Sequence, residues 1–165
     1  MRLKGIHHIS IVVRDMERTI HFYRDVLGLK LVKQTVNYDD PSSKHFYFGD
    51  DDASPGTLLT FFEVPYAGPG RIGAGSTHHF AMAAEDEDEL VRWQEKLREN
   101  GIAVTDIRDR TYFRSIYFQD PDGHIVEIAT IGPGFYVDEE RLGEKMVYPD
   151  GLQKELAANA AEETV

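Results

Sequence analysis

Apolar and polar positions along the chain follow one order of elements, and that order occurs twice. Residues 6–13 alternate in polarity and are rich in β-branched side chains, which predicts a strand. A helix is predicted over residues 16–27, with Asp15 as its N-cap and Gly28 as its C-terminal glycine. Strand-like runs follow at residues 29–38, 45–49 and 57–64. The first unit therefore reads β-α-β-β-β.

The same order returns after a loop rich in glycine and proline, residues 65–76. A strand is predicted over residues 77–84 and a helix over 86–100, ending before Gly101. Three further strands are predicted at residues 102–110, 112–119 and 124–131, the last two joined by the turn sequence Asp120-Pro121-Asp122-Gly123. The two modules, 1–64 and 77–131, form an internal repeat of about 70 residues.

These elements predict an α+β fold. Two paired β-α-β-β-β modules are expected to form a curved mixed sheet that encloses a pocket. The C-terminal tail, residues 132–165, repeats nothing in the modules, and its alanine-rich part at 151–162 predicts a short helix. We interpret the tail as a surface clasp or a dimer arm.

The composition narrows the classes of partner. The chain has 18 basic and 29 acidic side chains and a formal net charge of −11, which argues against nucleic acid or an anionic membrane, because both bind basic surfaces. It has no cysteine, so any metal is held by nitrogen and oxygen ligands. No apolar run has the length of a signal peptide or of a membrane span. A cytoplasmic location is therefore expected.

Each module begins with a strand that carries a pair of histidines, His7-His8 in the first module and His78-His79 in the second. Successive side chains of a strand point to opposite faces. In the first strand, the set that includes His7 is otherwise bulky and apolar and should pack under the helix. His8 is therefore expected on the open face, and the same parity places His79 on the open face of the second module.

Glu127 is the one acid inside the otherwise apolar last strand of the second module. A buried carboxylate without a partner is costly, and a cation removes that cost. Two imidazoles and one carboxylate that leave other positions open suit Fe(II) or Mn(II), and another divalent metal is compatible with them. The pattern predicts a metal site at His8, His79 and Glu127.

Each of these residues has a commoner role when it is considered alone. A single strand histidine is usually a core or surface group, and Glu127 alone is more often the partner in an ion pair. The metal prediction depends on the joint pattern, in which all three side chains fall at strand positions that can converge.

Three segments resemble the vicinal oxygen chelate superfamily, which includes glyoxalases, bleomycin resistance proteins and extradiol dioxygenases. They are Gly5-Ile6-His7-His8-Ile9, Phe22-Tyr23-Arg24-Asp25-Val26-Leu27-Gly28-Leu29 and Phe118-Gln119-Asp120-Pro121-Asp122-Gly123-His124. The resemblance covers both modules. It implies that the paired modules form a cup around one metal.

A narrower resemblance points to the hydroquinone ring-cleaving dioxygenases. It is carried by the segments Leu31–Pro41, Ser54–Phe62 and Glu127–Phe135. It implies an Fe(II)-dependent dioxygenase for hydroquinone- or catechol-like aromatic diols, an oxidoreductase of aromatic compound degradation. The same resemblance places the metal ligands at His8, His79 and Glu127. Other active-site positions are implied at His7, His78, Arg110 and Tyr117, with Ser10 where the family often has threonine.

These implied residues have expected roles. Tyr117 and His78 are expected to hydrogen-bond substrate oxygens and move protons, and Arg110 to stabilise developing negative charge. The structural alternative for Arg110 is a surface pair with Asp106 or Asp109. Because the similar dioxygenases are usually about twice as long, the site is either built within one chain or shared across a homodimer. A homodimer is the favoured expectation, alongside a small aromatic substrate and dioxygen as partners.

Other activities remain open on the same fold. A glyoxalase-type lyase usually has a second glutamate, but here Thr60 aligns with Glu127, and Glu63 has the opposite parity. A fosfomycin-type thiol transferase needs a basic cavity, whereas aromatic residues suggest an aromatic lining. A non-enzymatic binding or resistance module would have no use for three metal ligands. The aromatic residues are Phe61, Phe62, Phe113, Tyr117 and Phe118.

Overall fold

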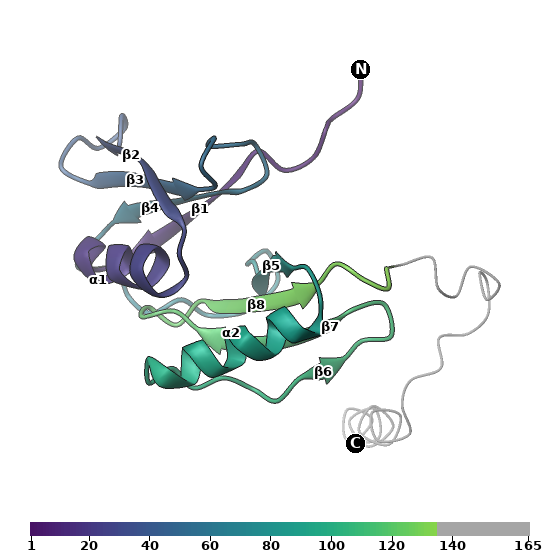
Figure 1. Cartoon of the computed structure of the whole chain (residues 1–165). Helices are drawn as coiled ribbons and strands as arrows, with labels where there is room; N and C mark the ends of the chain where they lie inside the picture. Colours follow the sequence, from purple (N-terminus) through teal and green to yellow (C-terminus); the bar gives the residue numbers. More distant parts are fainter. Residues whose placement is uncertain (135–165) are drawn as a thin grey trace, which may run out of the picture. The chain divides into compact units, whose positions relative to one another are not determined.

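The computed structural model describes residues 1–134, which form two β-α-β-β-β modules (Figure 1). The first module contains β1 (His8–Val13), α1 (Met16–Ile20), η1 (His21–Val26), β2 (Lys30–Val36), β3 (Lys44–Gly49) and β4 (Leu58–Glu63). The second contains β5 (His79–Ala84), α2 (Glu87–Glu99), β6 (Arg108–Asp109), β7 (Arg114–Gln119) and β8 (Ile125–Thr130). The helix expected at 151–162 lies outside the described residues, as does nearly all of the tail.

The two sheets have the same topology. Their strand orders are β1-β4-β3-β2 and β5-β8-β7-β6, and each has one parallel pair, β1 with β4 or β5 with β8, beside antiparallel neighbours. Both sheets are therefore mixed, and each is an open four-stranded sheet. This confirms the α+β class and the repeated β-α-β-β-β order.

The first helix begins where the sequence predicts, but it changes geometry midway. Asp15 is the N-cap, and its carboxylate accepts a hydrogen bond from the backbone N–H of Arg18 at 3.1 Å. From His21 onward the chain forms a π-helix, in which the N–H of Leu27 bonds the carbonyl of Phe22, five residues back. In this wider turn the apolar side chains of Phe22, Tyr23 and Val26 are buried. Gly28 follows with a positive φ of 80°, as a C-terminal glycine should.

The strand predicted over residues 102–110 is wrong for most of its length. Only a single bridge between Val104 and Phe118 and the two residues of β6 pair with β7. The hydroxyl of Thr105 accepts the N–H of Tyr117, and its backbone carbonyl accepts from the side chain of Gln94 on α2. Only the bond from the N–H of Thr105 to the carbonyl of Tyr117 remains of the ladder here, so the segment follows β7 without forming a continuous strand.

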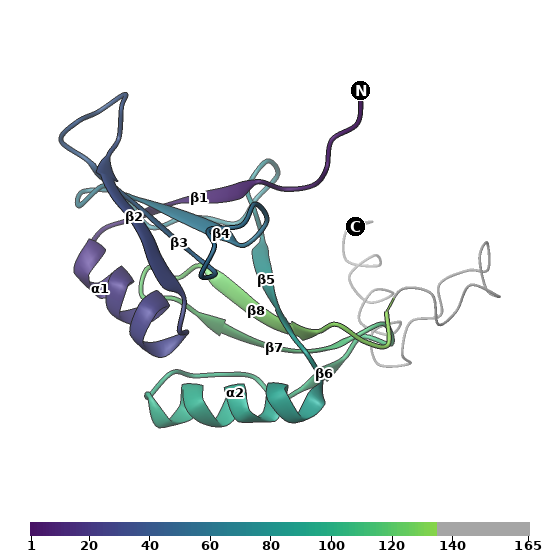
Figure 2. The same cartoon turned by 45° about the horizontal axis from the view of Figure 1, so that its top comes forward.

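One hydrophobic core includes side chains from both modules. In the second module, α2 lies along one face of its sheet (Figure 2), with Leu90 and Leu97 fully buried. In the first module the ring of Tyr23 packs on Phe61 at 4.5 Å between centroids. The same buried cluster contains Phe118 of β7. The modules therefore stabilise one another by sharing apolar surface.

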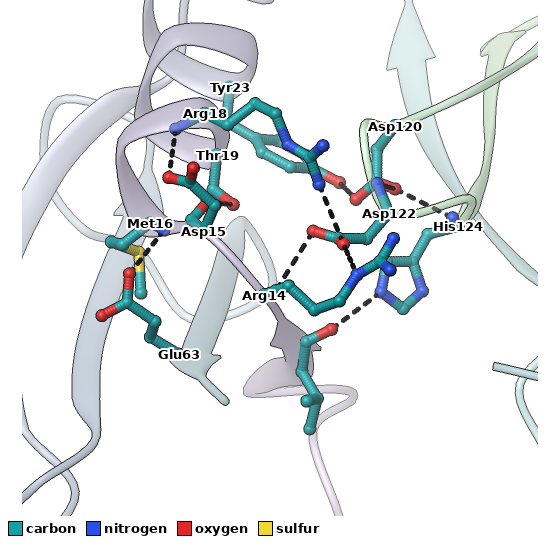
Figure 3. Close-up of polar contacts among 11 residues, drawn as sticks. Arg14, Asp15, Met16, Arg18, Thr19, Tyr23, Glu63, Asp120, Asp122 and His124 are labelled. Carbon is teal, nitrogen blue, oxygen red and sulfur yellow. Dashed lines mark hydrogen bonds and ion pairs between the residues drawn. The ribbon is translucent and has the colours of Figure 1, made fainter. Parts of the chain in front are cut away.

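The turn between β7 and β8 is attached to the first module by polar contacts (Figure 3). The buried hydroxyl of Tyr23 donates to Asp120 at 3.0 Å, and burial, followed by the charge of Asp120, raises the pKa of Tyr23 well above its ordinary value. The carboxylate of Asp120 also accepts the N–H groups of Asp122 and His124, which closes the turn. The ring of His124 reaches the carbonyl of Val12 at 3.1 Å.

Asp122 carries the charged part of this attachment. Its carboxylate pairs with Arg14 at 2.9 Å and with Arg18 at 3.0 Å, and only 7% of its side chain is exposed. Burial alone would raise the pKa of Asp122, but the hydrogen bonds from Arg14 and the charges of both arginines outweigh it and lower the pKa. The ionised form is therefore favoured in the folded protein.

We expect Asp122→Asn to destabilise the protein at pH 7 by about 1–2 kcal/mol, because it removes charge-assisted bonds between the modules. The difference from wild type should be present above about pH 3.9, the ordinary pKa of aspartate, and shrink as the pH falls through the lower folded pKa. Urea unfolding at several pH values measures it. Asp51→Asn is the control, since its pair with Lys30 is exposed, and an equal loss in both variants would contradict the prediction.

Candidate metal centre

The two histidine-bearing strands have the predicted parity. In β1, Ile11 and Val13 are buried under the helix, whereas His8 and Ser10 are exposed on the open face. In β5, His79 is exposed on the corresponding face, and the alternate residues beginning with Phe80 turn toward the core. The burial pattern confirms that His8 and His79 point away from the helices of their own modules.

Strand register shows which positions of the two modules correspond. Ser10 lies opposite Thr60 in the first sheet, and Ala81 lies opposite Glu127 in the second. Thr60 is therefore the counterpart of Glu127, as the sequence predicts. Glu63 accepts the N–H of Met16 at 2.8 Å and pairs with Lys44, so its carboxylate is engaged at the start of α1. A second carboxylate ligand from β4 is not available on the open face.

Glu127 is the centre of a polar cluster on the second module. Its side chain is 4% exposed, its Oε2 lies 2.9 Å from Nε2 of His79, and its Oε1 accepts the hydroxyl of Tyr117 at 2.6 Å. Arg110 donates to that hydroxyl at 3.3 Å and lies over the tyrosine ring. Arg110 thus contacts the site, while Asp106 and Asp109 pair with other arginines.

The adjacent histidines make the same contact in both modules. Nδ1 of His7 lies 3.0 Å from Nδ1 of His8, and Nδ1 of His78 lies 2.8 Å from Nδ1 of His79, with the rings edge to face in each pair. In each pair one Nδ1 donates and the other accepts, so the contact holds the two rings in place. His7 and His78 therefore orient the two predicted ligands and leave Nε2 of each for another bond.

The three predicted ligands fit a divalent metal in their chemistry, but in the described part of one chain they form two separate groups. His79 and Glu127 present one nitrogen and one oxygen within 2.9 Å of each other, and an imidazole–carboxylate pair is a usual part of a metal site. His8 lies on the first module, and among residues 1–134 no three His, Asp or Glu side chains are close enough together to hold an ion. The structure thus joins two of the three predicted ligands.

The first module has a polar cluster at the positions that match the Glu127 cluster. His45 is buried on β3, where its Nε2 lies 3.1 Å from the hydroxyl of Thr60 and its Nδ1 lies 3.3 Å from the hydroxyl of Tyr47. Thr60 in turn donates to Ser10 at 2.9 Å. Burial lowers the pKa of His45, and the charge of His8 lowers it further. The imidazole of His45 is therefore neutral near pH 7.

His45 and Tyr47 were not among the site residues predicted from the sequence. The signal was present, because they are two residues apart on a strand and so share a face, but only the register shows that this face also holds Ser10. The aromatic residues that the sequence suggested as a lining do not all lie on the open faces. Tyr117 lies in the site, whereas Phe61 is fully buried in the core and Phe118 packs near Phe22.

We expect Tyr117→Phe to weaken metal binding by about 10–100-fold, the usual cost of removing a group that orients a ligand. The lost bond is the 2.6 Å contact that holds Oε1 of Glu127. Competition with a coloured chelator measures the affinity. Tyr66→Phe is the matched control, because Tyr66 is fully exposed. An unchanged affinity in a folded Tyr117→Phe protein would mean that this bond does not orient the carboxylate.

A family comparison agrees with the fold and the motifs. Residues 5–128 match the model of the Glyoxalase/Bleomycin resistance protein/Dioxygenase superfamily. The chain belongs to this superfamily. Members of this superfamily bind divalent metals, and in this chain His8 and His79 lie on the two open faces.

Similar proteins include both dioxygenases and transferases. MhqA of Bacillus subtilis (strain 168), named as a candidate ring-cleaving dioxygenase, is 38% identical over 123 residues, which cover 74% of this chain and 39% of MhqA. The chlorohydroquinone/hydroquinone 1,2-dioxygenase of Sphingobium indicum is 33% identical, with coverage of 84% and 41%. The metallothiol transferase FosB of Staphylococcus haemolyticus is 32% identical, with coverage of 78% and 84%. The chain thus spans less than half the length of these two dioxygenases.

Solved structures support the fold. A glyoxalase/dioxygenase from Nostoc punctiforme superimposes with a TM-score of 0.61 at 28% identity, covering 77% of this chain and 90% of that one. In the described part of the chain, none of the helices has the length and apolar character needed to span a membrane.

Proposed function

We propose that this protein is an Fe(II)-dependent dioxygenase that cleaves the ring of hydroquinone- or catechol-like aromatic diols. The observation that carries the proposal is the buried carboxylate of Glu127, held by Tyr117 and facing Nε2 of His79. A buried carboxylate beside an imidazole, with Arg110 behind it, is suited to hold a cation and an anionic phenol at one place. The names of the dioxygenase relatives support the reaction class.

In this proposal the complete site forms between two copies of the chain. One copy contributes His8 from the open face of its first module, and the other contributes His79 and Glu127 from the open face of its second. A symmetric dimer would create two such sites, because each pairing of faces occurs twice. The separation of the two half-sites among the described residues of one chain supports this arrangement.

Divalent iron bound there would supply neighbouring positions for a substrate oxygen and dioxygen, and would favour the deprotonated phenol. Nδ1 of His78 is engaged with Nδ1 of His79 at 2.8 Å, which leaves Nε2 of His78 as the nitrogen that would take up the proton released by the substrate hydroxyl. His7 orients His8 in the same way. Tyr117 fixes Glu127, and the guanidinium of Arg110 balances negative charge as the phenol ionises.

The experiment is oxygen uptake by protein loaded anaerobically with Fe(II). Hydroquinone, methylhydroquinone, chlorinated hydroquinones and catechol are supplied in turn. We expect oxygen consumption with at least one of them and none from protein stripped of metal. Full metal occupancy without oxygen uptake for any diol would overturn the proposed reaction and leave the metal site standing.

A thiol transferase is the second candidate, because the chain covers 84% of FosB but only 41% of the hydroquinone dioxygenase. The same metal-loaded protein is incubated with fosfomycin and a small thiol, and the adduct is measured by mass spectrometry. Adduct formation without oxygen uptake would assign the protein to the transferases. Oxygen uptake without an adduct would assign it to the dioxygenases.

A further inference from the structure

The first module carries a chain of hydrogen bonds that ends on its open face. It runs from Tyr47 through His45 and Thr60 to Ser10, with spacings of 3.3, 3.1 and 2.9 Å. Thr60 is fully buried and His45 is 8% exposed. Buried polar side chains cost stability unless each is bonded, so a connected set of this kind in the middle of a sheet suggests a purpose beyond packing.

The direction of these bonds fixes the tautomer of His45. The hydroxyl of Thr60 donates to Ser10, so its oxygen is left to accept the proton on Nε2 of His45. A neutral imidazole that donates from Nε2 has a lone pair on Nδ1. Nδ1 therefore accepts the hydroxyl proton of Tyr47, and every bond in the chain points the same way.

The ring of His45 is also held by its neighbours. It stacks on Phe62 with centroids 3.9 Å apart and lies against the ring of Tyr47 at 4.4 Å. Two aromatic contacts and two hydrogen bonds leave the imidazole one orientation. Because Tyr47 donates its proton to this fixed ring, the phenol oxygen is fixed as well, with lone pairs left to accept a bond.

The repeat shows how Tyr47 differs from its counterpart. Register places Tyr47 opposite Thr60, as it places Tyr117 opposite Glu127. The hydroxyl of Tyr117 donates to a carboxylate and accepts from Arg110, so it is already used both as a donor and as an acceptor. The hydroxyl of Tyr47 instead donates to a neutral ring, which makes its oxygen an acceptor directed to the face that carries His8.

We propose that Tyr47, held in place by His45, accepts a hydrogen bond from the second hydroxyl of an aromatic diol. The first hydroxyl of the diol binds at the His8 side of the site. Tyr47 is on β3 and His8 on β1, two strands away across β4, which separates their backbones by about 10 Å. An aromatic ring bound at the His8 side spans such a gap and brings its other hydroxyl to Tyr47. Tyr47 would therefore select diols over simple phenols. This inference rests on the proposed function, because it assumes that an aromatic diol is the substrate.

The test measures binding rather than turnover. Protein loaded with Zn(II), which cannot change its oxidation state, is titrated with hydroquinone and with phenol by calorimetry under nitrogen. We expect wild type to prefer hydroquinone and Tyr47→Phe to bind hydroquinone about 3–10-fold more weakly, with phenol affinity and zinc content unchanged. Tyr38→Phe, at an exposed tyrosine, is the matched control and should behave as wild type.

His45 is tested as a positioning residue. His45→Leu should lose the preference for hydroquinone while retaining phenol binding, and His45→Gln, which keeps a hydrogen-bonding side chain, should recover part of it. Equal weakening of both ligands by Tyr47→Phe, or no preference in wild type, would overturn the proposal. Diol preference that depends on Tyr47 but occurs without oxygen uptake would support this inference while contradicting the proposed reaction.

Discussion

Glu127→Gln is expected to lower metal affinity by more than about 100-fold, the upper range for loss of a group that only orients a ligand. The substitution keeps the shape of the side chain but removes the charge that faces His79 at 2.9 Å. An amide is a weak ligand for a divalent ion, and the bond from Tyr117 no longer has a charged acceptor. Oxygen uptake with any diol should be lost together with the metal.

Calorimetric titration with Mn(II) measures the affinity, and elemental analysis after dialysis measures retention. Glu95→Gln is the matched control, because Glu95 is an exposed residue on α2. Circular dichroism of both variants verifies that they are folded. If Glu127→Gln binds metal as wild type does, the carboxylate has only a structural role. That result would overturn the proposed metal site.

His8→Ala and Glu127→Ala are expected to complement each other when they are combined in one dimer. Each variant alone should bind no metal, because every site lacks one ligand. In the mixed dimer, one site receives His8 from the Glu127→Ala chain and His79 and Glu127 from the His8→Ala chain. That site is intact, so about half of the wild-type metal content should return.

Two affinity tags allow the mixed dimer to be purified after co-expression. The matched control is the mixed dimer of His79→Ala with Glu127→Ala, in which both losses fall on the same half-site and neither site is whole. Metal in the first mixed dimer and none in the second would support a shared site. No metal in either would mean that one chain supplies all three ligands.

Much of the fold was predictable because local patterns were strong. The alternation in β1 and β5, the cap at Asp15 and the turn at Asp120 each follow from side-chain chemistry within a few residues. The failure at residues 102–110 has a different origin. There, the N–H of Thr105 still bonds the carbonyl of Tyr117, but the N–H of Tyr117 bonds the hydroxyl of Thr105 and the carbonyl of Thr105 accepts from Gln94 on α2. Such long-range partners are not visible in a local pattern.

The candidate site was predictable only in part. Parity along single strands was enough to place His8 and His79 on open faces, and Glu127 was predicted because it is the one acid in an apolar strand. Pairing between strands was needed to find His45 and Tyr47, since their importance comes from Thr60 on the neighbouring strand. Among residues 1–134 His8 does not come together with the other two predicted ligands, and alternation within single strands does not show how the open faces of the two modules are placed.

The contact between Tyr23 and Asp120 bears on whether one module can be produced without the other. The chain reads as a duplicated unit, yet the first copy supplies the phenol and the second supplies the carboxylate that it meets out of water. A half-length fragment ending near residue 70 would expose the face that covers Phe118 and leave a lone polar group on it. Such fragments should aggregate when produced singly, so each module needs the other to stay folded in solution.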